Sequence, residues 1–147
     1  MVVIFSPMLP PATLESLQQR ARTCLPAHLG IRITQLSLGE LHAELSIRPE
    51  VMAVNGFLHA GTVVSLADTA AAFGCIAHLP DGAENFTTVE LKSNHVGTAR
   101  EGTIACIATL LHGGRSTQVW DATVSHVETG KVIGYYRCTQ MILYPRA

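Results

Sequence analysis

The stretch Gly61-Thr-Val-Val-Ser-Leu-Ala-Asp-Thr-Ala-Ala-Ala-Phe-Gly-Cys-Ile-Ala77 is apolar at nearly every position, which predicts a helix that is buried on almost all of its faces. Asp68 is the only charged residue between His59 and His78. A carboxylate in such a helix loses hydration, and this costs free energy unless another group pairs with it or the protein uses it. Asp68 is therefore the first candidate for a functional residue.

The segment Asn55-Gly-Phe-Leu-His-Ala-Gly61 leads directly into this helix. Backbone N–H groups at the start of a helix carry partial positive charge, so they favour an oxyanion or a carbonyl oxygen. Donors of this kind next to a helix that carries one buried carboxylate indicate an acyl-transfer or hydrolysis site.

Outside the helix, the sequence pattern is that of strands. Apolar and polar residues alternate over residues 40–48, as in a strand with one wet face, and residues 31–38 form its expected hairpin partner, with a turn at Gly39. A short peripheral helix is expected over residues 12–22, after Pro10 and Pro11. Four further strand-like runs follow the apolar helix: residues 86–94, 102–112, 117–128 and 132–143.

These elements predict an α+β fold, in which a curved antiparallel sheet of about six strands wraps around one long central apolar helix. With 147 residues the chain can bury a core without disulfides. We expect a single domain over residues 1–147, with an N-terminal extension over residues 1–30 and a core over residues 31–144. The edges and partly apolar outer face of such a sheet invite a second copy, so we expect at least an obligate dimer.

Charge and cysteine spacing exclude several classes of protein. The 10 Lys and Arg nearly cancel the 11 Asp and Glu and form no runs, so neither a nucleic-acid surface nor a polybasic membrane anchor is indicated. Cys24, Cys75, Cys106 and Cys138 form no C-x-x-C pair, and we expect reduced packing residues rather than a metal or redox site.

Nothing in the chain predicts export or membrane insertion. Residues 1–5 are apolar but lack a basic flank and a cleavage site, and the longest apolar run, residues 70–77, is short for a membrane span. We therefore expect a soluble cytoplasmic protein. Five histidines have no metal-ligand spacing and are expected at the surface or in turns: His42, His78, His95, His112 and His126.

The spacing within the helix constrains the site. If the helix begins near Ala60, Asp68 lies eight residues further on, which is about 12 Å along the axis. One ester or thioester carbon cannot be reached by both groups of a single chain. Two such helices that run antiparallel across a two-fold axis would bring the start of one opposite the carboxylate of the other. This geometry favours a site shared between subunits.

The order of elements, with Asn55-Gly-Phe-Leu-His-Ala-Gly61 and Leu66-Ala-Asp-Thr-Ala70, resembles the hotdog-fold acyl-CoA thioesterases of the phenylacetate-pathway (PaaI-like) family. The resemblance covers about residues 31–144. It extends to the strand Phe86-Thr-Thr-Val-Glu-Leu-Lys-Ser-Asn-His95 and to the segments Gly97-Thr-Ala-Arg-Glu-Gly102 and His112-Gly-Gly-Arg-Ser-Thr117.

The resemblance implies roles for particular residues. Asp68 is the implied nucleophile or general base, and the backbone N–H of Ala60, within the motif His59-Ala60-Gly61, polarises the thioester carbonyl. Asn55 and Thr88 are the candidates for the amide and the hydroxyl that family members also use. Phe57, Leu58 and Phe73 are candidates for the acyl pocket, and Arg100, Gly114, Arg115 and Ser116 are candidates for coenzyme A contacts.

Two positions depart from the family pattern. Ala60 stands where most relatives have Gly, and the position six before His59, where many relatives have an amide side chain, is Ala53. His59 could order the turn by bonding the backbone instead of acting on substrate, and Asn55 beside Gly56 is also an ordinary turn signal.

Three functions are compatible with the sequence. The first is hydrolysis of an acyl-CoA thioester without a metal or redox cofactor, either by water with Asp68 as base or through an anhydride on Asp68. The second is an enoyl-CoA hydratase or dehydratase of the same fold, and the third is a non-catalytic acyl-CoA sensor. The expected partners are the acyl-CoA substrate and further copies of the chain, as a homodimer or homotetramer. The acyl group stays open.

Overall fold

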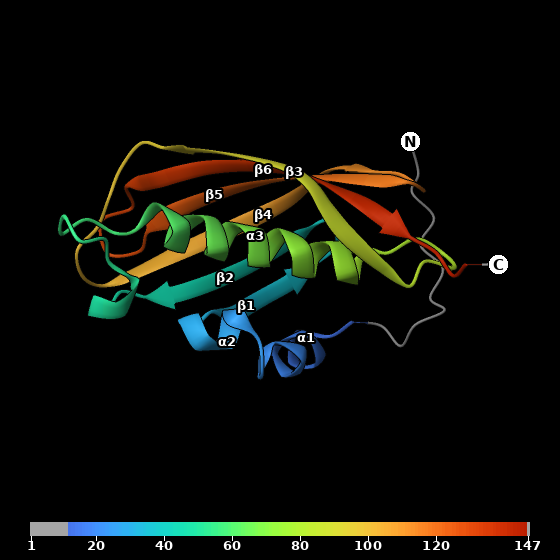
Figure 1. The fold of residues 1–147 in the computed structure, drawn as a ribbon, viewed down its shortest axis with the longest axis horizontal. Helices are drawn as coiled ribbons and strands as arrows, with labels where there is room; N and C mark the ends of the chain where they lie inside the picture. Colours follow the sequence, from blue (N-terminus) through green and yellow to red (C-terminus); the bar gives the residue numbers. More distant parts are fainter. Residues whose placement is uncertain (1–11, 147) are drawn as a thin grey trace.

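Six antiparallel strands form one curved sheet around a long helix in the computed structural model, which describes residues 12–146 (Figure 1). The expectations for residues 1–5, Pro10 and Pro11 lie outside the described residues. In chain order the elements are α1 (Leu14–Ala21), α2 (Leu25–Leu29), β1 (Arg32–Ser37), β2 (Glu40–Ser46), the 3-10 turn η1 (Pro49–Val51), α3 (Ala60–Ala77), β3 (Asn85–His95), β4 (Thr103–Gly113), β5 (Thr117–His126) and β6 (Val132–Leu143).

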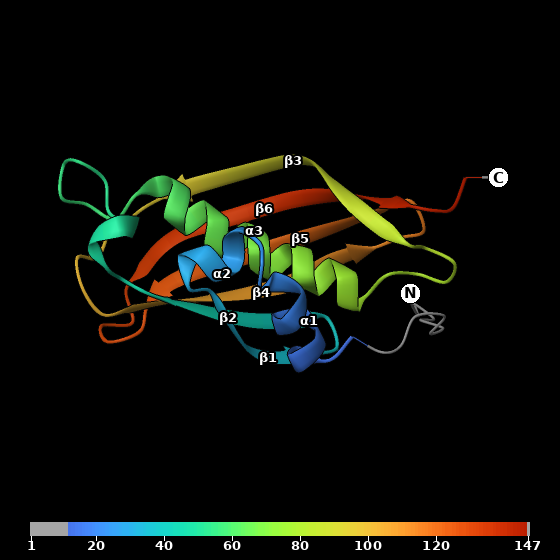
Figure 2. The ribbon, with the colours of Figure 1, turned by 60° about the horizontal axis from the view of Figure 1, so that its bottom comes forward.

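The strands lie in the order β1-β2-β4-β5-β6-β3, so β1 and β3 are the edges of the sheet. α3 crosses the hollow side of the sheet and packs mainly on β2, β4, β5 and β6 (Figure 2). The predicted fold class is confirmed. The alternation over β2 is also confirmed, because Leu41, Ala43 and Leu45 are fully buried.

α3 sits close to the sheet because small residues line its buried side, among them Ala67, Ala70 and Ala71. At Gly74 the helix backbone lies directly against Trp120 of β5. A Cβ atom at Gly74 would lie 2.7 Å from two carbons of the buried Trp120 ring, so only glycine fits here. Glycine costs about 1 kcal/mol in a helix interior, and here it lets the largest side chain of the core lie directly against the helix.

By length and composition alone, α3 could cross a membrane, since its 18 residues have a mean hydropathy of 1.5. The sequence predicts no such segment, because its longest apolar run, residues 70–77, is short for a membrane span. Half of the helix is buried inside the protein. The packing of α3 on the sheet thus accounts for much of its apolar character.

The N-terminal extension contains two short helices, of which only the first was predicted. α1 begins after Thr13, whose hydroxyl accepts a hydrogen bond from the Ser16 N–H in a capping box. α2 has only five residues. Its C-terminal carbonyls are held by Arg48, whose guanidinium donates to the Leu29 oxygen at 2.7 Å and to the His28 oxygen at 2.9 Å.

β3 is exposed along nearly its whole length, including Val89 at 54 % and Leu91 at 43 %. The strand is an edge of the sheet, and α3 lies mainly over the other strands. An exposed edge with apolar side chains is a surface on which another strand can pair.

One prediction about the cysteines is wrong. Cys24 is exposed, so it is not a packing residue, whereas Cys75, Cys106 and Cys138 are buried as expected. Burial raises the pKa of the Cys75 and Cys106 thiols to about 12. These two thiols therefore stay protonated and unreactive at neutral pH.

His78 follows α3 in a turn, as expected, but it is buried, with 4 % of its surface exposed. Its Nδ1 lies 2.7 Å from the Gly74 oxygen and its Nε2 accepts a hydrogen bond from the Gly39 N–H at 2.7 Å. Gln118 donates to the His78 carbonyl and accepts from the Trp120 indole N–H. This network joins the end of α3 to the β1–β2 turn and to β5. Because Nε2 accepts from the Gly39 N–H and Nδ1 lies against a carbonyl oxygen, the His78 imidazole must be neutral with its proton on Nδ1.

We predict that His78 makes the fold sensitive to acid. Burial lowers the pKa of His78 from its ordinary value of 6.5, so below that pH the unfolded chain binds a proton that the folded protein resists. The stabilisation is complete above pH 6.5 and is lost as the pH falls toward the lowered pKa. Between about pH 7.5 and 5.5, the free energy of unfolding should decrease by on the order of 1 kcal/mol more in wild type than in His78→Gln.

Urea unfolding followed by circular dichroism at the two pH values measures this difference. The His78→Gln protein is the control, because it keeps every other titrating group. Equal pH dependence of the two proteins would contradict the prediction.

Candidate functional site

Asp68 lies in the middle of α3 and is half-buried. Its Oδ1 accepts a hydrogen bond of 2.6 Å from the hydroxyl of Tyr136, on the neighbouring strand β6. Within residues 12–146, no other residue bonds the Asp68 carboxylate. One carboxylate oxygen is thus held by the sheet, and the other is available for chemistry.

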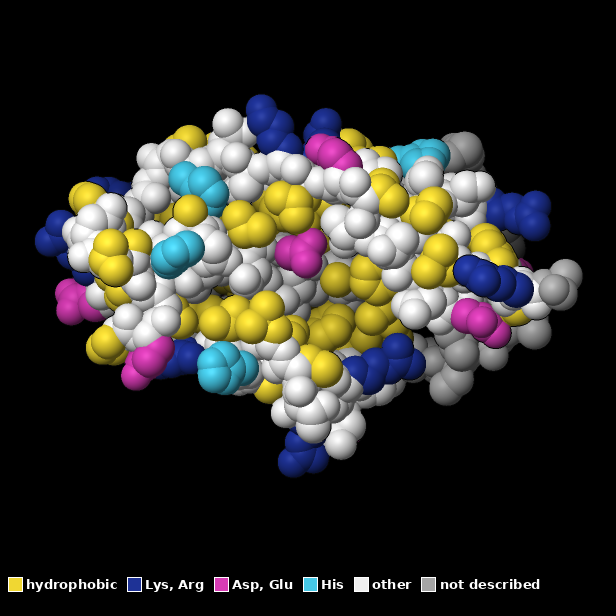
Figure 3. All heavy atoms as spheres, in the orientation of Figure 1, with side chains coloured by type: hydrophobic (Ala, Val, Ile, Leu, Met, Phe, Trp, Pro, Cys, Tyr) yellow, Lys and Arg dark blue, Asp and Glu magenta, His cyan; other side chains and the backbone are white. Residues whose placement is uncertain are grey.

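The side of α3 that carries Asp68 is half-buried and combines apolar residues with small polar ones. Figure 3 shows this face of the molecule, where apolar side chains gather along the helix. The half-buried residues on this side are Val64, Ser65, Asp68, Thr69, Ala72 and Ile76. A half-buried carboxylate beside apolar side chains is suited to a site that becomes dry when another molecule covers it.

The start of α3 is built by the motif His59-Ala60-Gly61. His59 is the N-cap, and its Nδ1 accepts a hydrogen bond of 2.8 Å from the Gly61 N–H. A Cβ atom at Gly61 would lie 2.9 Å from that Nδ1, so any larger residue here would force the His59 ring to shift from its capping position. His59 thus has a structural role as the cap of α3, and the position of its ring explains why a glycine follows at position 61.

The His59 cap pairs with the N–H of Gly61 and does not pair with the N–H of Ala60. No acceptor within residues 12–146 pairs with it. Ala60 does not have a positive φ, so alanine occupies this position without backbone strain. The first N–H of the helix therefore points out of the helix start as a donor for a ligand oxygen.

Asn55 lies at the tip of an exposed loop before the helix. Its side-chain oxygen accepts a hydrogen bond from the Phe57 N–H at 3.3 Å, and the loop is closed by Ala53 and Phe57, whose N–H and C=O pair at 2.7 Å. In one chain Asn55 is therefore near the start of α3 and away from Asp68.

Thr88 is also separated from Asp68. Its hydroxyl donates to Gln140 at 2.8 Å, and Gln140 is four residues after Tyr136 on β6, which corresponds to about 13 Å. The β3 residue that lies opposite Tyr136 is Ser93. The sequence analysis missed both Ser93 and Tyr136, because the pairing of β3 with the last strand cannot be read from the sequence.

The three candidates for the acyl pocket fall into two groups. Leu58 and Phe73 are buried in the core of the single chain, at 7 % and 9 % exposure. Phe57 is 44 % exposed, and the Arg100 guanidinium lies 5.4 Å from the centre of its ring. Phe57 and Arg100 thus form one exposed pair beside the start of α3.

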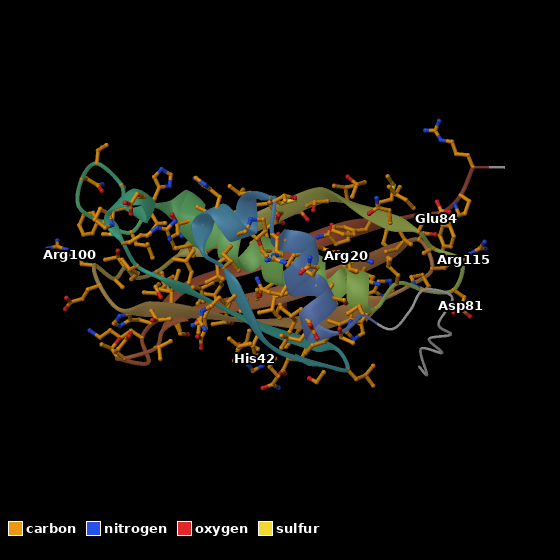
Figure 4. All side chains as sticks on the ribbon, turned by 90° about the horizontal axis from the view of Figure 1, so that it is seen from below. Arg20, His42, Asp81, Glu84, Arg100 and Arg115 are labelled. Carbon is orange, nitrogen blue, oxygen red and sulfur yellow. The ribbon has the colours of Figure 1, made fainter. Side chains whose placement is uncertain are left out.

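The candidates for coenzyme contacts lie at opposite ends of the molecule, as Figure 4 shows for Arg100 and Arg115. Gly114, Arg115 and Ser116 form the turn between β4 and β5, in which Arg115 and Ser116 are exposed. The Tyr144 hydroxyl donates to the Arg115 carbonyl at 2.7 Å and so holds this turn to the residues after β6. Within residues 12–146, no three His, Cys, Asp or Glu side chains form a group that could hold a metal ion.

We predict that His59 acts mainly as a helix cap. His59→Ala should lower the free energy of unfolding by about 1 kcal/mol, whereas His59→Asn, whose side-chain oxygen can cap the same N–H, should keep most of the stability. Urea unfolding of the three proteins provides the measurement. Equal losses in both variants would contradict a capping role.

Comparison with known proteins places the chain in a family. Residues 55–133 match the family model of the thioesterase superfamily. The chain is 33 % identical over 112 residues to a 1,4-dihydroxy-2-naphthoyl-CoA hydrolase of Listeria monocytogenes, covering 76 % of this chain and 89 % of that protein. It is 29 % identical over 133 residues to the Escherichia coli protein of the same name, covering 89 % and 95 %.

The fold is also that of solved thioesterases. A mutant thioesterase from Pseudomonas aeruginosa superposes with a TM-score of 0.85 at 26 % identity, over 91 % of this chain and 96 % of that one. The six-stranded antiparallel sheet and the long helix packed against it agree with these similarities. The chain belongs to the thioesterase superfamily and is a thioester hydrolase with the hotdog fold.

Proposed function

We propose that this protein hydrolyses an acyl-CoA thioester to a free acid and coenzyme A, with Asp68 as base or nucleophile. The observation that carries the proposal is the position of Asp68, as a half-buried carboxylate on a helix that carries no other charge, with one oxygen unpaired. The names of two relatives support a CoA thioester as the substrate.

Two routes use the same groups. In the first, Asp68 takes a proton from water as the water oxygen bonds to the thioester carbonyl carbon. In the second, Asp68 itself attacks that carbon, and water then hydrolyses the mixed anhydride. In both, the C–S bond breaks and the thiolate of coenzyme A takes up a proton, while a helix-start N–H stabilises the negative carbonyl oxygen. These groups and water suffice, so we propose no metal or redox cofactor.

We propose that each site is shared by two subunits. α3 begins at Ala60, eight residues before Asp68, so the free N–H and the carboxylate of one chain are about 12 Å apart. An antiparallel partner helix would bring its own Ala60 N–H opposite Asp68 and would cover the half-buried apolar side of α3. The exposed edge strand β3 offers the matching place for strand pairing.

The same arrangement would unite the coenzyme candidates. Arg100 lies beside the start of α3, and Arg115 lies at the opposite end of the molecule (Figure 4). Across an antiparallel dimer, Arg100 of one subunit approaches Arg115 of the other, and guanidinium groups bind phosphate oxygens through paired hydrogen bonds. We propose this homodimer as the active unit, with pairing into a homotetramer through the remaining surfaces.

We propose a cytoplasmic location, because the four cysteines are free, as is usual in a reducing compartment. The acyl group is best sought with a panel of esters. One methylene changes discrimination by only about 1–3 kcal/mol, so short, medium, long and aromatic esters, including 1,4-dihydroxy-2-naphthoyl-CoA, all belong in it.

We predict that Asp68→Asn lowers kcat by about 10²–10⁴-fold, measured as thiol release from the best ester of the panel, with a chelator present. The matched control is Asp121→Asn, which removes a carboxylate from the other side of the sheet, where it pairs with Arg137. Turnover retained in Asp68→Asn would refute the assignment. Water addition to an enoyl-CoA by the wild type would favour a hydratase.

We predict that two inactive variants restore activity when they are mixed. Ala60→Pro removes the backbone N–H at the first helical position, where proline is well tolerated, so this variant should fold and lose turnover. A heterodimer of Ala60→Pro and Asp68→Asn subunits has one site with both changes and one with neither. Co-refolding equal amounts should recover about one quarter of the wild-type rate. No recovery would show that each site lies within one chain.

A further inference from the structure

Tyr136 is the residue through which the sheet contacts the Asp68 carboxylate. It lies on β6 with 4 % of its surface exposed, and its hydroxyl donates to Asp68 Oδ1 at 2.6 Å. Every buried side-chain nitrogen and oxygen within residues 12–146 has a hydrogen-bond partner. The Tyr136 hydroxyl thus has its hydrogen-bond partner in Asp68.

The hydroxyl position is fixed by the strand that carries it. A tyrosine side chain has only two torsion angles, and its buried ring is surrounded by packed atoms. The flanking strands place Ala122 of β5 and Ser93 of β3 directly opposite Tyr136, two small side chains that leave the ring its space. The strand therefore sets where the donor lies, and the donor sets the orientation of the carboxylate.

Tyr136 acts as a donor and not as an acid. Burial raises the pKa of Tyr136 above its ordinary value of 10.0, and the hydrogen bond to Asp68 raises it further. The hydroxyl keeps its proton at neutral pH. Neither the family motif nor the helix start contains this residue, which lies 68 positions after Asp68.

We propose that Tyr136 is a positioning residue for the reaction, which holds Oδ1 of Asp68 so that Oδ2 faces the thioester carbon or the attacking water. The inference rests on the proposed role of Asp68. A carboxylate on a half-buried helix face could otherwise rotate toward solvent, and a misplacement of about 1 Å can cost about 10²-fold in rate. The hydrogen bond removes that freedom before substrate binds.

The variant that tests this inference is Tyr136→Phe, which deletes only the hydroxyl. We expect kcat to fall by about 10- to 100-fold with KM within about twofold of wild type, because a reacting group is misplaced and substrate contacts remain. The matched control is Tyr135→Phe. Tyr135 directly precedes Tyr136 on β6, faces the other side of the sheet and is 50 % exposed. Its variant should therefore keep wild-type kinetics.

Measurements in the Asp68→Asn background separate the catalytic role proposed for Asp68 from the positioning role proposed for Tyr136. If Tyr136 acts through Asp68, adding Tyr136→Phe to Asp68→Asn should cause no further loss of kcat. An Asp68→Asn protein with wild-type turnover would refute the proposed function. An inactive Asp68→Asn protein together with wild-type kinetics in Tyr136→Phe would overturn the positioning role alone, and so would a further loss in the double variant.

A second measurement applies if Tyr136→Phe does not fold. Replacement of Tyr136 by 3-fluorotyrosine keeps the hydroxyl and makes it a stronger donor. A stronger donor holds Oδ1 of Asp68 at least as well as tyrosine does, so the positioning role predicts kcat and KM close to wild type. A loss of kcat at constant KM would overturn it.

Discussion

One sheet cannot cover all sides of an apolar helix. This constraint determines which side of α3 is buried and which side stays uncovered. The sheet curves around α3 and buries the side that carries Leu66, Ala67 and Ala70. The opposite side, equally poor in charge, stays half-exposed. Asp68 lies on that second side, at the boundary between the dry interior and the uncovered surface. The exposed apolar residues of β3 belong to the same uncovered region.

Much of the fold is readable from the sequence because its signals are local. An apolar run with one charge predicts α3, and alternation predicts β2, since both patterns report burial directly. α2 could not be predicted, because a helix of five residues depends on Arg48, a residue far along the chain. The burial of His78 depends likewise on Gly39 and Gln118, which only the folded chain brings together.

The residues of the candidate site likewise fall into two groups, those that local sequence patterns indicate and those that only the folded chain reveals. Asp68 and the start of α3 can be identified from sequence, because a lone charge and a helix-start motif are features of short segments. Tyr136 could not be identified, since nothing local distinguishes it from Tyr135. The structure also explains a requirement that sequence alone states only as a motif. Glycine is favoured at position 61 because a larger residue would displace the His59 ring that caps the helix.

The contact between Gly74 and Trp120 has a practical consequence. Trp120 is the only tryptophan in the chain, and its ring lies against α3, 5.4 Å from the centre of the His78 ring. Its fluorescence therefore comes from a single place, the junction between the helix and the sheet. A buried indole emits at shorter wavelength than one in water, so the emission maximum reports directly whether α3 is seated. The protein carries its own optical probe for following folding and assembly without a label.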